Sequence, residues 1–113
     1  MPSLQASGTE TPTVGTEAQL ADTNVAGVFS FHVDTVNMAT GDITELRVYQ
    51  MVLTAGTSRV VFEQTFYGVQ LADDLIKISL PIGNDLTDST ALRFSLKQTF
   101  GTARAYPWKV LKY

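Results

Sequence analysis

The stretch VFSFHVD, residues 28–34, alternates apolar and polar side chains from its second residue onward. Successive side chains of a β-strand point to opposite faces of the sheet, so strict alternation predicts a strand with one buried face. The residues expected on the core side are Phe29, Phe31 and Val33, and those on the other side are Ser30, His32 and Asp34.

The same period of two recurs along most of the chain, whereas helical spacing is nearly absent. Turn-forming Gly, Asn and Asp residues separate the alternating stretches, and about seven or eight strands result. We therefore predict an all-β, single-domain antiparallel β-sandwich, with a jelly roll as the preferred variety because eight strands in two Greek keys fit 113 residues. The further alternating stretches are residues 43–53, 59–69, 75–82, 92–98 and 105–113.

The first 24 residues differ in composition from the rest, being rich in Thr, Ser, Gly and Ala. Such a segment fits a disordered tail, but apolar residues at Leu4, Val14 and Leu20 also suit an extended arm that pairs with another subunit. We therefore divide the chain into an extended N-terminal arm, 1–24, and a sandwich domain, 25–113. A short strand near 17–21 is expected to belong to the sandwich.

Composition narrows the function classes. The chain has no cysteine, which excludes disulfides and thiolate sites, and its charged content is only 17%. Residues 1–92 contain eleven acidic and three basic residues, a net −8, whereas residues 93–113 contain five basic residues and no acidic one. Eight basic residues are too few for a phosphate-tracking groove, so we expect no nucleic-acid partner. No signal peptide or membrane-spanning run is apparent, and we expect synthesis in the cytoplasm.

One phrase occurs twice, as TAGTSR at 54–59 and TFGTAR at 99–104. A glycine-rich loop that ends in arginine could bind an anion, but phosphate loops lead from a strand into a helix. Here each phrase lies between two strands. We therefore predict two similar tight hairpins in which glycine supplies a positive φ.

No catalytic, metal or cofactor site is predicted from the residues. His32 is the single histidine, and no serine lies in a nucleophile elbow, so a Ser-His-Asp arrangement stays only formally possible. Paired acids, of which GNDLTD at 83–88 is the best calcium candidate, also serve turns. A sugar-binding platform of aromatic residues is an alternative to a core role. The aromatic residues concerned are Tyr106, Trp108 and Tyr113.

Several phrases together resemble a family of small proteins encoded in tailed-phage genomes. They are GTSR after ELRVYQMVL, the loop DTVNMATGD at 34–42, and LKQTFGTARAYPWKVL near the C-terminus. The resemblance covers nearly the whole chain. The closest described class consists of the small β-sandwich decoration, or cement, proteins of phage heads, which commonly form trimers over joints between capsid subunits.

The resemblance implies a non-enzymatic virion protein on the capsid surface, with the major capsid protein and copies of itself as partners. The alternative is a tail or neck component with a carbohydrate-binding β-sandwich. We expect the N-terminal arm to dock onto neighbouring subunits and the basic C-terminal segment to meet an acidic capsid surface. The candidate partner-binding residues are Leu4, Thr9, Thr11, Pro12, Val14, Arg104, Lys109 and Lys112.

Overall fold

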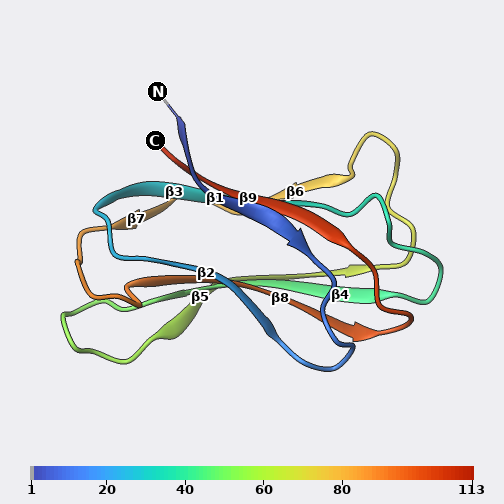
Figure 1. Ribbon diagram of the computed structural model, residues 1–113, viewed down its shortest axis with the longest axis horizontal. Coiled ribbons are helices and arrows are strands. Elements are labelled where there is room, and N and C mark those ends of the chain that lie inside the picture. Colours follow the sequence, from blue (N-terminus) through green and yellow to red (C-terminus); the bar gives the residue numbers. More distant parts are fainter. Residues whose placement is uncertain (1) are drawn as a thin grey trace.

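The computed structural model describes residues 2–113 and contains nine β-strands in two antiparallel sheets packed face to face (Figure 1). We call them sheet A, with strand order β1-β9-β3-β6 and β7 also paired to β3, and sheet B, with order β2-β8-β4-β5. The predicted all-β sandwich is thus confirmed. The strands are β1 (Ser3–Glu10), β2 (Ala18–Thr23), β3 (Gly27–Asp34), β4 (Ile43–Gln50), β5 (Arg59–Tyr67), β6 (Ile76–Ile78), β7 (Ile82–Asn84), β8 (Leu92–Phe100) and β9 (Tyr106–Lys112).

The register shows that the chain is one long hairpin folded back on itself. Strands of the first half pair with strands of the second half in reverse order, from the termini inward to the β4–β5 turn. This order supports the jelly-roll prediction, which stays a prediction, because a jelly roll arises when such a long hairpin is rolled into two sheets. Representative facing pairs are Ser3–Lys112, Ala18–Leu96, His32–Ile78 and Gln50–Arg59.

The core lies between the sheets and contains the side chains that the alternation assigned to it. Phe29, Phe31 and Val33 of β3 are fully buried, and Phe31 meets Phe94 of β8 with 5.6 Å between ring centroids. The buried Lys77 of β6 lies between the edges of the two sheets, where its ammonium is 4.8 Å from the centre of the Phe66 ring of β5. Burial of these apolar side chains is the main stabilising contribution in a domain of this size.

The N-terminal segment is part of the sandwich, which differs from the predicted division at residue 24. Ser3–Glu10 pairs along β9 at the edge of sheet A, and Ala18–Thr23 pairs with β8 at the edge of sheet B. Gly8 permits this pairing, because a Cβ there would lie 3.3 Å from the indole of Trp108. The segment is extended, but its backbone is paired within its own chain. Met1 lies outside the described residues.

The two copies of the repeated phrase form different structures, so the prediction of two similar hairpins is wrong. The first joins β4 to β5 within sheet B, and there Ala55, not Gly56, has a positive φ of 58°. The second carries the chain from β8 in sheet B to β9 in sheet A, with φ of 98° at Gly101. Asp42 packs so closely against Gly101 that any Cβ would clash with it.

Candidate interaction surface

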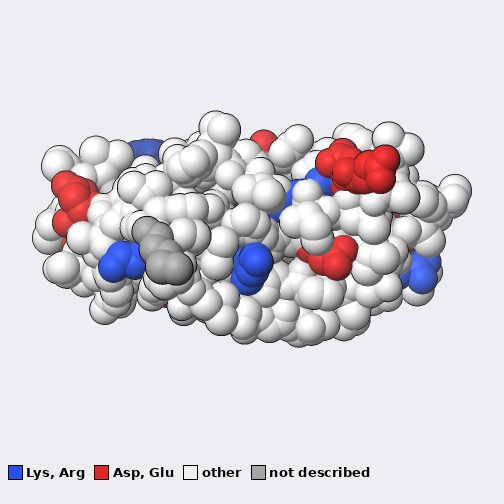
Figure 2. Space-filling model, turned by 90° about the horizontal axis from the view of Figure 1, so that it is seen from above, with Lys and Arg blue, Asp and Glu red and all other residues white. Residues whose placement is uncertain are grey.

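The outer face of sheet A is mainly apolar and uncharged. Alternation along β3 sends Phe29 and Phe31 into the core and leaves His32 and Asp34 on the opposite, outer side. Figure 2, seen from the side of sheet A, shows charged side chains scattered over a mostly uncharged surface. The large apolar side chains exposed on this face, with their exposed fractions, are Leu4 (62%), Val28 (41%), Ile76 (50%), Ile78 (55%) and Tyr113 (51%).

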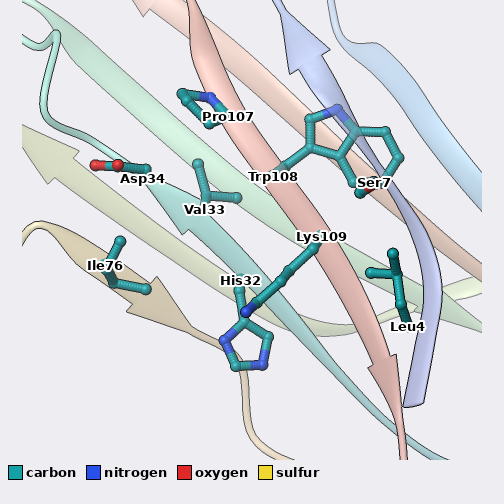
Figure 3. Close-up of a pocket in the computed structure, with 9 residues that line it drawn as sticks. All are labelled: Leu4, Ser7, His32, Val33, Asp34, Ile76, Pro107, Trp108 and Lys109. Atoms are coloured by element: carbon teal, nitrogen blue, oxygen red, sulfur yellow. The ribbon is translucent and has the colours of Figure 1, made fainter.

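A shallow cavity of about 410 Å³ lies on this side of the sheet, and its wall is formed by residues of β1, β9, β3 and β6 (Figure 3). In Figure 3 the Lys109 side chain reaches from β9 toward His32 on β3, while Asp34 lies further along β3 and points away from both. The lining residues are Leu4, Ser7, His32, Val33, Asp34, Ile76, Pro107, Trp108 and Lys109.

Lys109 is the one basic residue and Asp34 the one acidic residue among the strand residues on this face, and neither forms an ion pair within residues 2–113. Lys109 stands directly opposite His32 in the register of β9 and β3. One carboxylate oxygen of Asp34 accepts a hydrogen bond from the Val36 backbone N–H at 3.0 Å. The face therefore carries one uncompensated charge of each sign.

His32 takes part in a hydrogen-bonded chain, but not in a catalytic triad. Its Nε2 lies 2.7 Å from Ser30 Oγ, and that oxygen lies 2.9 Å from the Tyr113 hydroxyl. Burial, followed by the charge of Lys109, lowers the pKa of His32, so the ring is neutral at pH 7. No carboxylate among the described residues hydrogen-bonds to the ring to orient it as a general base.

The outer face of sheet B differs, because most of its charged side chains form ion pairs with one another. Arg47 of β4 lies at the centre, with ion-pair distances of 3.0 Å to Glu45, 3.2 Å to Glu63 and 3.7 Å to Glu17. These residues come from neighbouring strands and from the loop before β2. The network therefore crosses the whole sheet and ties that loop to it.

Glu17 connects this network to two further strand residues by accepting hydrogen bonds from them. It accepts hydrogen bonds from Ser95 and from Tyr49, the latter at 2.8 Å. Burial alone would raise the pKa of Glu17, but the hydrogen bonds from Ser95 and Tyr49 and the charge of Arg47 outweigh it and lower the pKa. The carboxylate is therefore ionised, and it contributes to stability as an anion.

The predicted partner-binding residues fall into separate places. Leu4, Thr9 and Lys109 lie on the outer face of sheet A, Thr9 in register with Pro107. Thr11, Pro12 and Val14 lie in the β1–β2 connection, where Thr11 is exposed, Pro12 is buried and Val14 is half-buried. The basic residues Arg104 and Lys112 lie off that face: Arg104 donates to the buried Asp42 at 2.8 Å, and Lys112 packs beside Gly27.

The other candidate sites from the sequence have structural roles. Asp34 and Asp42 accept hydrogen bonds from backbone N–H groups two and three residues away, as turn residues do, and Asp88 accepts one from the N–H of Ala55 in the β4–β5 loop. Within residues 2–113 there is no cluster of three or more side chains suited to a metal ion. The aromatic platform is also absent, because Tyr106 is fully buried and Trp108 packs against the core.

Sequence reasoning missed the contribution of β6. Ile76 and Ile78 alternate with Lys77, and an apolar face would ordinarily be the buried one, yet the buried residue of this strand is Lys77, at 7% exposure. The alternation was a correct signal for a strand. Which side faced the core depended on the pairing of β6 with β3, and periodicity carries no information on that.

No protein-family model, no curated protein and no solved structure matches this chain. Within residues 2–113, no helix is long and apolar enough to cross a membrane.

Proposed function

We propose that this chain is a non-enzymatic structural protein that works by binding other protein subunits, of the head-decoration type that the sequence resembles. In that role it sits on the capsid surface of a tailed phage and binds the major capsid protein as well as copies of itself. No cofactor takes part in this function.

The observation that supports the proposal is the contrast between the two outer faces. On sheet B three carboxylates gather around Arg47, whereas on sheet A Lys109 and Asp34 form no ion pair and lie beside large exposed apolar side chains. Contiguous exposed apolar surface is uncommon on a monomer that acts alone and is typical of an interaction site. A sandwich with one such face suits a protein that is a component of an assembly.

The test is quantitative mass spectrometry of purified particles of the source phage, with copies of this chain counted against copies of the major capsid protein. Comparable copy numbers are expected for a decoration protein. A handful of copies per particle would place the chain in the neck or tail instead, and its absence from particles would overturn the proposal.

The alternative function is a carbohydrate-binding tail or neck component, and the cavity on sheet A favours it to some extent. Ser7, His32, Asp34 and Lys109 offer polar groups beside apolar ones, as sugar sites do. Glycan-array binding that is lost in His32→Ala would support this alternative, whereas wild-type protein that binds no glycan would exclude it.

A further inference from the structure

We propose that the outer face of sheet A binds a second copy of this chain in a two-fold arrangement that sets Lys109 of each copy against Asp34 of the other. The inference rests on the proposed function, since it names one partner of the face that carries it. It replaces the trimer that the resemblance implies with a dimer.

The charges of the face are the first argument. Among the strand residues of this face, Lys109 is the one cation and Asp34 the one anion, and His32 stands directly opposite Lys109. Figure 2 shows further charged side chains around them. An isologous two-fold interface places the same patch on both subunits, so that each residue meets the counterpart of its partner. A patch with one charge of each sign, set apart along the sheet, is therefore complementary to a rotated copy of itself. A uniformly acidic or basic partner would match only one of the two.

The separation of the two charges fits this arrangement. Lys109 is opposite His32, and Asp34 lies two residues further along β3 on the same face. Two residues of a strand and one strand spacing separate them by roughly 8 Å. A lysine can span such a diagonal between neighbouring strands, yet Lys109 and Asp34 form no ion pair within residues 2–113. A two-fold axis that passes between the two residues brings each to its counterpart.

The size of the face is the second argument. The molecule measures 41 by 19 Å across the view of Figure 2, which gives a footprint on the order of 800 Å². A standard protein–protein interface buries about 800 Å² on each partner. A dimer of standard size would therefore have to cover nearly the whole of this side of the molecule, from Leu4 on β1 to Ile76 and Ile78 on β6.

Sedimentation equilibrium of the purified chain over a concentration series is the test. Wild-type protein should reach a mass twice the 12.3 kDa of the chain. Lys109→Asp and Asp34→Lys should each raise the dimer Kd at least tenfold, since each sets like charges together. The double variant Lys109→Asp/Asp34→Lys exchanges the two charges and should restore dimerisation.

Two control variants separate the interface from folding. Lys97→Gln removes the charge of a lysine on the outer face of sheet B and should leave the dimer intact. Asp34→Asn removes the charge but keeps an acceptor for the Val36 N–H, so it should weaken the dimer without loosening the turn. Circular dichroism checks that each variant is folded.

Wild-type protein that is monomeric or trimeric overturns the inference, and so does a folded double variant that stays monomeric. These outcomes are distinguishable from failure of the proposed function. A monomer found at high copy number on particles keeps the function and rejects the dimer. A charge-dependent dimer that is absent from particles keeps the dimer and rejects the function.

Discussion

The two outer faces of this sandwich use charge in opposite ways. On sheet B, Arg47 gathers Glu17, Glu45 and Glu63 within 4 Å, and the network holds a loop to the sheet. On sheet A, Lys109 and Asp34 have no such partners and stand among exposed apolar side chains. The difference is that the charges around Arg47 tie strands and a loop of sheet B together, whereas Lys109 and Asp34 form no ion pair within residues 2–113. Four predictions test this contrast.

The largest effect is expected from removing the central cation of sheet B. Arg47→Met should lower the free energy of unfolding by about 2 kcal/mol, because the half-buried carboxylates of Glu17 and Glu45 and the exposed one of Glu63 lose their shared partner. The matched variant Lys109→Met should change it by less than about 0.5 kcal/mol. Urea denaturation of both variants measures the difference, and equal losses would contradict the contrast.

The second prediction concerns pH. The pKa of Glu17 is lower in the folded chain than its ordinary value of 4.5. The stability it contributes is therefore fully present above pH 4.5 and is lost as the pH falls through the folded pKa. Glu17→Gln should lower the free energy of unfolding by about 1 kcal/mol at pH 7. As the pH falls, the free energy of unfolding of this variant should decrease less steeply than that of wild type. Urea titrations from pH 7 to pH 3 test this, and an acid limb as steep as that of wild type would assign the loss to other groups.

The third prediction concerns the replacement of one exposed apolar side chain of sheet A by a charged one. Ile78 is 55% exposed, so Ile78→Glu should change the free energy of unfolding by no more than about 0.5 kcal/mol. It should nevertheless abolish self-association and particle binding, because a charge would be buried in the contact. Gln19→Glu, an exposed position on sheet B, is the control. Association that survives Ile78→Glu would move the interaction surface elsewhere.

The smallest effect is expected from an exposed ion pair at the rim of sheet B. Arg93 and Asp22 lie 3.2 Å apart, and both side chains are about one-third exposed. Arg93→Ala should therefore cost only about 0.3 kcal/mol, close to the effect of Lys97→Ala, which removes no ion pair. Thermal unfolding of both variants compares them. A loss as large as that of Arg47→Met would mean that the network on sheet B extends to its edge.

Parts of the candidate surface were predictable from the sequence. Alternation placed His32 and Asp34 on the polar side of β3, and Lys109 and Leu4 were named as partner-binding residues. Ile76 and Ile78 were missed, since both faces of β6 look plausible in isolation. Arg104 was assigned to a partner, yet it is bound to Asp42, which lies 62 positions away in the sequence.

The sequence by itself determined that this chain is an all-β sandwich and that Phe29, Phe31 and Val33 lie in its core, because a period of two is a local property of a strand. Only the tertiary structure decided that residues 3–10 pair with the last strand. The tertiary structure also decided that one copy of the repeated phrase forms a hairpin, whereas the other crosses from one sheet to the other. Strand pairing depends on hydrogen bonds between residues far apart in the chain, so similar local sequences can take different conformations when different neighbours, such as Asp42 beside Gly101, pack against them.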